Sequence, residues 1–268
     1  MPWVRFLQEG QICWGQLRHE AQCDYIQAYA GTPFEDGCRP VAGRERLPLS
    51  VTPLLAPCDP SKIVCIGRNF SAHARELGNE VPKEPLFFLK PPSALLAPGG
   101  TILLPVLSQH VEYEGELALV IRRRCSHFSA SADPRPYILG YTCLNDVTAR
   151  DLQKSDPVFT RAKGFDTFCP IGPWVSEAPR EGDRPWDGLE IETRVNGELL
   201  QHGNTRDFMF PLPRLLAAVT AVMTLEPGDV LATGTPSGVS KLSPGDRVRV
   251  TISGVGSLEN SVAAAPSA

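Results

Sequence analysis

Short apolar runs that end at glycine, proline or aspartate follow one another along the chain, and this pattern predicts a protein made mainly of β-strands. The clearest expected strands cover 62–67, 86–90, 114–122 and 137–144, with a hairpin over 189–201. Asn196-Gly197 supplies the two-residue turn of that hairpin. Helical periodicity is confined to short segments, so the expected helices cover 71–78, 147–154 and 211–225.

The ends of the expected helices carry local signals. Ser71 is a candidate N-cap for the first helix, and Gly78 is a candidate stop. Asn145 and Asp146 precede the second helix, and Pro213 falls in the first turn of the third.

The sequence pattern predicts a boundary between two domains near residue 57. Residues 1–56 read as a small N-terminal β domain, and 57–268 as the larger domain. Three prolines within 53–60 indicate a linker with little backbone pairing, while 263–268 reads as a loose tail. The predicted fold class is therefore α+β and strand-rich.

Composition and charge exclude several functional classes. The 26 prolines among 268 residues are about twice the usual share, which favours turns over long helices. A net charge of -4 without a basic stripe argues against nucleic acid as a partner. No apolar run reaches the roughly 18 residues of a membrane span, and the first residues lack the apolar centre of a signal peptide. We therefore expect a cytoplasmic protein without a membrane partner.

The eight cysteines stand singly along the chain, without a C-x-x-C pair. Several, including Cys65, lie in apolar runs where a thiol packs as a small hydrophobic group. This spacing favours reduced structural thiols over a disulfide framework or a zinc site.

Three acids fall on one face of the expected strand that follows His110. Glu112, Glu114 and Glu116 are two residues apart, so strand geometry puts neighbouring carboxylates about 6.5 Å apart. At an effective dielectric of about 20, a poorly solvated ionised pair repels by roughly 2 to 3 kcal/mol. Either water or a cation must offset this repulsion, and the segment alone leaves both possibilities open.

Asp146 also has two interpretations. An aspartate between a strand and a helix is most often an N-cap. If Asp146 instead meets Glu114 and Glu116, the three carboxylates make an oxygen-only site suited to a hard ion such as Mg²⁺ or Mn²⁺.

Other residues could carry chemistry near such a site. His73 and Glu76 share a helical face and can form a base with its orienting carboxylate, although such pairs are more often surface contacts. Lys90 and Lys163 adjoin apolar residues and could hold an ammonium near a site or reach solvent. The turn 233–238 offers amides and hydroxyls to a carboxylate, but it lacks the lysine of a phosphate loop.

Seven segments, in the same order, resemble the fumarylacetoacetate hydrolase family. They are 62–70, His73 with Glu76, 85–92, 113–117, 145–151, 163–166 and 233–239. The small N-terminal β-unit fits bacterial members, so the resemblance covers nearly the whole chain. It implies a mixed β-sandwich roll that is usually a homodimer. One departure is Phe70, which stands where tyrosine is common.

For the site, the resemblance implies a divalent metal held by Glu114, Glu116 and Asp146. Glu112 lies outside this ligand pattern, as an acid in water at the rim or behind the ligands. The cofactor expected is Mg²⁺ or Mn²⁺, which share oxygen ligands and octahedral geometry.

The resemblance also implies that His73 and Glu76 form a base dyad on a mobile lid helix. Lys163 and Gln153 match positions that touch the substrate near the metal. Arg68, Lys90 and Thr235 lie within matching segments and are further candidate substrate-binding residues.

These residues together predict a metal-dependent enzyme that cleaves a C–C bond in a small 2-oxo acid. The reaction would be hydrolysis of a 3-acylpyruvate or decarboxylation of oxaloacetate, through a metal-stabilised pyruvate enolate. An alternative is a tautomerase or isomerase of 2-oxo or 2-hydroxydienoate dicarboxylates, such as oxaloacetate or 2-hydroxyhepta-2,4-diene-1,7-dioate. A third alternative is a non-catalytic binding protein with the same fold.

Overall fold

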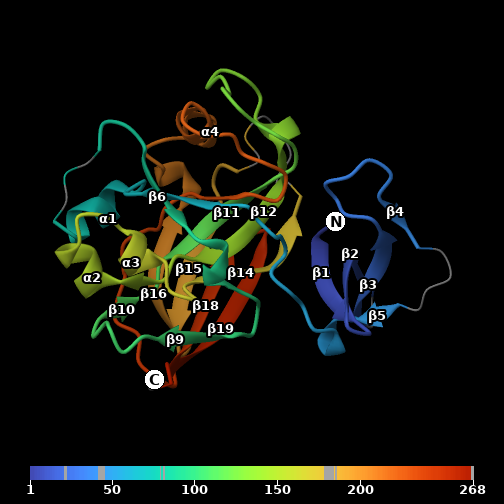
Figure 1. Cartoon of the computed structure of the whole chain (residues 1–268), viewed down its shortest axis with the longest axis horizontal. Helices are drawn as coiled ribbons and strands as arrows, with labels where there is room; N and C mark the ends of the chain where they lie inside the picture. The colour runs from blue at the N-terminus through green and yellow to red at the C-terminus, as the bar shows by residue number, and fades with distance from the viewer. Residues whose placement is uncertain are drawn as a thin grey trace.

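Two β-sheets packed against each other form the body of the molecule, and a small N-terminal unit extends one of them (Figure 1). The computed structural model describes residues 1–20, 23–41, 46–78, 80, 82–177, 184 and 186–266. Within these ranges no helix is long and apolar enough to cross a membrane.

The N-terminal unit is a set of short antiparallel strands beside a 3₁₀ turn. Its elements are β1 (Trp3–Gln8), β2 (Gln11–His19), β3 (Asp24–Ala30), β4 (Arg39–Pro40), β5 (Leu47–Pro48) and η1 (Leu49–Val51). Alternate residues of β1 to β3 point to one face and form a core of their own, made of Val4, Phe6, Leu17, Ile26 and Ala28. β1 also pairs with β14 (Cys169–Ser176), so the unit continues the large sheet.

The large sheet is mixed. From β14 it continues through β12 (Ile138–Asn145), β11 (Gly115–Ile121), β17 (Val230–Ala232), β6 (Ile63–Gly67) and β7 (Leu86–Lys90). The pair β17–β6 is parallel, whereas β11 is antiparallel to both of its neighbours. A short strand, β8 (Leu95–Leu96), adds a parallel partner to β14.

The second sheet contains the predicted hairpin. Its strands, in spatial order, are β16 (Glu198–Asn204), β15 (Glu190–Val195), β18 (Arg247–Ile252), β19 (Gly256–Ala264) and β9 (Thr101–Leu104). Asn196 and Gly197 both have positive φ and connect β15 to β16, as predicted. Two more short strands, β10 (Val111–Glu112) and β13 (Thr148–Ala149), form a separate ladder.

The helices are short and surround the sheets. The α-helices are α1 (Ser71–Glu76), α2 (Arg150–Ser155), α3 (Thr160–Lys163) and α4 (Leu212–Thr220). The remaining 3₁₀ turns are η2 (Pro92–Ala94), η3 (Arg135–Tyr137) and η4 (Thr205–Asp207). In Figure 1, α1, α2 and α3 gather on the left of the view, away from the N-terminal unit.

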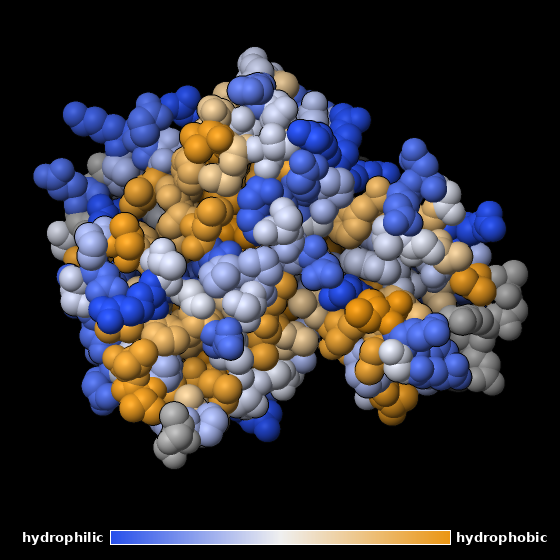
Figure 2. Space-filling model, in the orientation of Figure 1, coloured by the Kyte–Doolittle hydropathy of each residue, from blue (hydrophilic) through white to orange (hydrophobic). Residues whose placement is uncertain are grey.

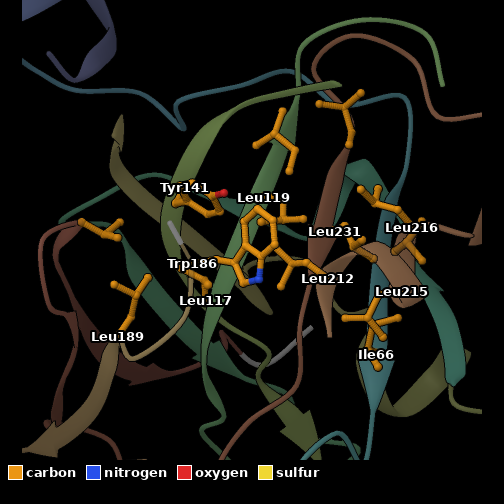
Figure 3. Packing of buried hydrophobic residues seen from close by; sticks show 14 of the residues in the cluster. Ile66, Leu117, Leu119, Tyr141, Trp186, Leu189, Leu212, Leu215, Leu216 and Leu231 are labelled. Carbon is orange, nitrogen blue, oxygen red and sulfur yellow. The ribbon is translucent and has the colours of Figure 1, made fainter. Parts of the chain in front are cut away.

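The main hydrophobic core lies between the sheets and under α4. Figure 3 shows Leu212, Leu215 and Leu216 of α4 beside side chains of the large sheet. Side chains alternate between the two faces of β11, since Leu117 and Leu119 belong to this core and Ala118 to a second core on the opposite face. Both faces of β11 are therefore buried, which fixes its register firmly.

The surface is indented where the N-terminal unit meets the larger body. Figure 2 shows a notch in the outline between the larger body and the smaller N-terminal unit, with apolar residues on both sides. Arg5, Trp14 and Phe34 of the N-terminal unit line a cavity together with Asp59 and Gly228 of the larger part.

Four local predictions are wrong in detail. Helical periodicity over 211–225 predicts an apolar stripe that includes Val222, but the third helix ends at Thr220 and Val222 is exposed. The helix α1 begins at Ser71 without a side-chain cap, although Gly78 follows it with a φ of +68° as expected of a stop. The expected helix 147–154 begins only at Arg150, because the preceding residues pair as β13.

The two segments predicted to lack pairing are also ordered in part. Leu54, in the expected linker, forms a bridge with Phe6, and the Leu55 N–H donates to the Arg5 carbonyl. The expected loose tail is the end of β19, which pairs with β9 as far as Ala264. Positions 267 and 268 of that tail lie outside the described residues.

Candidate active site

The candidate site lies at one end of the large sheet. Because β11 runs antiparallel to β12 and β17, and β17 runs parallel to β6, the start of β11 meets the ends of the other three strands. Gly115 pairs with Asn145, so Glu114 lies beside Asp146, whose N–H donates to the Glu114 carbonyl at 2.8 Å. Polar residues that are distant in sequence therefore converge at this edge.

Three carboxylates meet there. Glu114, Glu116 and Asp146 each offer an oxygen, and these oxygens lie within 4.8 Å of one another. Their side chains are almost fully buried, with 5%, 1% and 1% of the residue surface exposed. A second group with similar spacing, Glu192 with its neighbours Glu190 and His202, lies on the β15–β16 hairpin and is partly exposed to solvent.

Two lysines bind the carboxylates from within the protein. Nζ of Lys163 donates to Oε2 of Glu114 at 2.8 Å and to Oδ2 of Asp146 at 2.7 Å. Nζ of Lys90 donates to Oδ1 of Asp146 at 2.6 Å. Both lysines are buried, so neither reaches solvent, and both oxygens of Asp146 are occupied by an ammonium. The N-cap interpretation of Asp146 is therefore wrong.

Arg150 is a buried residue of the site that the sequence reasoning missed. Its guanidinium donates to Oε1 of Glu114 at 2.5 Å, to Oε2 of Glu112 at 2.7 Å and to Oε1 of Gln153 at 2.5 Å. Glu112 is itself 7% exposed and also contacts His110, so it lies behind Glu114 rather than in water at the rim. The sequence offered one signal for Arg150, because a cluster of buried acids needs several positively charged side chains around it.

The charges shift the pKa values in opposite directions. Burial opposes ionisation of Glu114, but Lys163 and Arg150 outweigh it and lower the pKa of this carboxyl below its usual range. For Glu116, burial and the charges of Asp146 and Glu114 all act together and raise the pKa well above its usual range. Of the three carboxylates, Glu116 is therefore the one whose negative charge is least offset by positively charged neighbours.

The donor set fits a hard divalent cation. All three side chains offer oxygen, the atom type that Mg²⁺ and Mn²⁺ prefer. Glu116 accepts a hydrogen bond from the Gly234 N–H at 2.7 Å, and among the described residues no lysine or arginine forms an ion pair with it. A cation bound here would supply the charge that Glu116 lacks.

His73 and Glu76 are in contact on α1, as their spacing predicts. Nδ1 of His73 lies 3.1 Å from Oε2 of Glu76, and the imidazole is almost fully buried. An ionised Glu76 carboxylate can only accept a hydrogen bond, which favours the tautomer with the proton on Nδ1 and the lone pair on Nε2. Phe70, just before α1, is buried with its ring 5.1 Å from that of Phe208, so an apolar contact takes the place of a hydroxyl.

One cavity of about 280 Å³ brings these groups together. Besides the three carboxylates, His73 and Lys163, its walls include Arg68, Gln153 and Thr235, three of the predicted substrate-binding residues. Its apolar walls are formed by Ile66, Leu77, Leu86, Phe88 and Phe159. Lys90 lies behind Asp146 and is not part of the wall. It would therefore influence a ligand in the cavity through its hydrogen bond to Asp146 and not by direct contact.

The order of these residues along the chain matches a known family. The family model described as the C-terminal part of fumarylacetoacetate (FAA) hydrolase matches residues 62–263, which include every residue of the cavity. The chain belongs to the fumarylacetoacetate hydrolase family. A second model, described as Rv2993c-like, N-terminal, matches residues 1–57.

Named relatives within the fumarylacetoacetate hydrolase family act on oxaloacetate. The chain is 44% identical over 203 residues to the mitochondrial oxaloacetate tautomerase of Arabidopsis thaliana, covering 74% of this chain and 89% of that protein. It is 41% identical over 200 residues to the mitochondrial oxaloacetate decarboxylase of Dictyostelium discoideum, covering 72% of this chain and 89% of that protein.

Solved structures of the family confirm the predicted fold. The crystal structure of 5-carboxymethyl-2-hydroxymuconate delta-isomerase from Mycobacterium smegmatis has a TM-score of 0.88 and 38% identity, covering 99% of this chain and 100% of that one. Maleylpyruvate hydrolase from Sphingobium sp. SYK-6, in complex with manganese(II) and pyruvate, has a TM-score of 0.78 and 31% identity, with the same coverage. The names of these relatives span isomerase, decarboxylase and hydrolase, so family membership does not by itself select a reaction.

Proposed function

We propose that the chain is a divalent-metal-dependent enzyme that cleaves a C–C bond in a small 2-oxo acid, either a 3-acylpyruvate or oxaloacetate. The observation that carries this proposal is the buried group of Glu114, Glu116 and Asp146, which shares one cavity with His73. Burying three acids together costs free energy that a bound divalent metal would offset, and the histidine beside them adds a group that can transfer protons.

Glu114, Glu116 and Asp146 would hold the metal, and a divalent ion there supplies Lewis-acid stabilisation of negative charge on the substrate. Lys163 lies between two of these ligands, so its ammonium is positioned to stabilise the enolate oxygen that appears when the bond to C3 breaks. The maleylpyruvate hydrolase structure, with manganese(II) and pyruvate, supports this assignment by similarity.

His73 would act as the general base in acylpyruvate hydrolysis. Nε2 takes a proton from a water molecule as the water oxygen attacks the distal carbonyl carbon. The bond between that carbon and C3 then breaks, which releases a carboxylic acid and the pyruvate enolate, and the enolate takes up a proton. Oxaloacetate would give the same enolate by losing carbon dioxide, with no attack by water.

A second candidate is the keto–enol tautomerisation of oxaloacetate. It is favoured by the similarity to the Arabidopsis tautomerase and by His73, which lines the cavity and would move a proton to or from C3. Tautomerisation passes through the enolate of oxaloacetate and decarboxylation gives the enolate of pyruvate, so both place negative charge on the 2-oxo oxygen and the same cavity suits both.

A substrate panel separates these reactions. Purified protein with Mg²⁺ or Mn²⁺, and with chelator, is given oxaloacetate, acetylpyruvate, fumarylpyruvate and 2-hydroxyhepta-2,4-dienedioate. Released carbon dioxide reports decarboxylation, released pyruvate with a second acid reports hydrolysis, and loss of enol absorbance alone reports tautomerisation. We expect His73→Ala to lose acylpyruvate hydrolysis by about 10²- to 10⁴-fold. Turnover that survives thorough chelation would contradict the metal dependence, and metal binding without turnover of any substrate would favour a binding protein.

A further inference from the structure

The Glu76 carboxylate is held from two sides. Its Oε2 contacts Nδ1 of His73, while its Oε1 accepts a hydrogen bond from the Gly238 N–H at 2.9 Å. Gly238 belongs to the loop that follows β17, far from α1 in the sequence. A carboxylate fixed through both oxygens cannot rotate freely, so this contact determines how Glu76 aims the imidazole.

Gly238 is in turn held by a buried tyrosine. The Tyr113 hydroxyl donates to the Gly238 carbonyl at 2.8 Å and lies 2.8 Å from Oγ of Ser240. Tyr113 is fully buried, between the two strands β10 and β11. An unbroken series of contacts therefore runs from Tyr113 through both polar main-chain atoms of Gly238 to Glu76 and His73.

The close packing around Gly238 makes this arrangement rigid. A Cβ on residue 238 would lie 2.0 Å from the Leu200 carbonyl oxygen, and the backbone φ is +103°. Only glycine fits such a position, and the loop lies directly against the main chain of β16. The Tyr113 hydroxyl closes the other side by fixing the direction of the Gly238 carbonyl.

We propose that Tyr113 is a positioning residue for the His73–Glu76 pair, acting through the main chain of Gly238. The inference rests on the proposed function only in assigning the base role to His73. The alternative is that the Tyr113 hydroxyl stabilises the loop without influencing the imidazole. The two roles differ in whether the effect of removing the hydroxyl passes through Glu76.

A double-mutant cycle with Tyr113→Phe and Glu76→Ala, measured by the rate of turnover, tests whether the effect of the Tyr113 hydroxyl passes through Glu76. We expect Tyr113→Phe to lower kcat by about tenfold while KM stays within about twofold, because the base is misaimed while the substrate site is intact. In the Glu76→Ala background the same change should have no further effect on kcat. Additive effects in the cycle would overturn the proposal.

A measurement that needs no turnover keeps this inference separate from the proposed function. Proton–nitrogen NMR of the His73 ring in the metal-free protein reports whether Nδ1 carries the proton. We expect the wild type to show the Nδ1-protonated form, and both Tyr113→Phe and Glu76→Ala to show a mixture of tautomers. A Tyr113→Phe spectrum identical to wild type would overturn the inference even if no substrate were ever turned over.

Two further variants control for loss of a hydroxyl as such. Tyr141→Phe removes the same group from another buried tyrosine, in the main core, and should leave the His73 spectrum unchanged. Ser240→Ala removes the second partner of Tyr113 but keeps its bond to Gly238, so it should also leave the spectrum unchanged. A mixture of tautomers in Ser240→Ala would contradict the proposal without relying on Tyr113→Phe to fold.

Discussion

The ammonium of Lys163 lies 2.7 Å from the carboxylate of Asp146, so a proposed metal ligand is already bound to a cation belonging to the protein. Lys163 also contacts Glu114, and the two carboxylates raise the pKa of its buried ammonium above the usual range, although burial itself opposes the charge. The lysine therefore stays charged at any physiological pH, and it competes with the metal for the same oxygens.

Lys163→Met should therefore separate metal binding from turnover. We expect metal affinity to rise by at least about tenfold, because a charge repelling the divalent ion is removed. Turnover should fall by about 10²-fold or more, because the group that stabilises the enolate is lost. Calorimetric titration with Mn²⁺ and steady-state rates measure the two effects. Lys154→Met, at an exposed lysine of the cavity wall, is the matched control for metal affinity. If Mn²⁺ bound Lys163→Met more weakly than the wild type, the prediction would be contradicted.

Glu116→Gln should stabilise the metal-free protein near neutral pH. The folded-state pKa of Glu116 is raised, chiefly by burial and then by neighbouring carboxylates, so its ionisation costs stability above the ordinary pKa of a glutamate. A neutral amide removes that cost, and the advantage should disappear as the pH falls toward the ordinary glutamate range, where both states are protonated. Urea unfolding in chelator across this pH range measures the difference. Equal stability of the two proteins at neutral pH would contradict the raised pKa.

Added metal should reverse that order of stability. Binding only to the folded state stabilises it by about 2.7 kcal/mol at a hundredfold excess over Kd. We expect Mn²⁺ to raise the unfolding midpoint of the wild type and to have little effect on Glu116→Gln. Glu192→Gln, in the partly exposed acidic group on the β15–β16 hairpin, should respond to Mn²⁺ like the wild type. A response lost in Glu192→Gln instead would move the metal site to the hairpin.

Arg150→Ala should destabilise the fold strongly. Its guanidinium is buried between Glu112 and Glu114, and removing one partner of a buried ion pair typically costs about 3 to 5 kcal/mol. The unfolding midpoint in urea, measured in chelator, tests this expectation. Arg161→Ala breaks an exposed pair with Asp156 and should leave the midpoint almost unchanged. Similar midpoints for the two variants would show that Glu112 and Glu114 do not depend on Arg150.

The sequence predicts the strands and the acidic residues better than it predicts how charges pair. Alternation along β11 and the Asn196-Gly197 turn are local features, so they are readable without a structure. Asp146 has the local appearance of an N-cap, but its oxygens bind Lys90 and Lys163, which lie 56 and 17 residues away in the chain. Contacts at such separations leave no local pattern.

The break between β10 and β11 escaped prediction for the same reason. The alternation of acids suggests one continuous strand from Glu112 to Glu116, yet Glu112 pairs with Thr148 of β13 while β11 begins at Gly115 and pairs with β12. A change of partner depends on segments that fold back from elsewhere. The family resemblance nevertheless brought Glu114, Glu116 and Asp146 together correctly, because it carries the order of distant segments.

The pairing of β1 with β14 bears on how the large sheet avoids adding strands from other chains. An uncovered edge of a sheet presents free N–H and C=O groups to which other chains can add. β1 pairs with β14 at Trp3 and Val175, so the N-terminal unit covers backbone groups of the large sheet to which another chain could otherwise add.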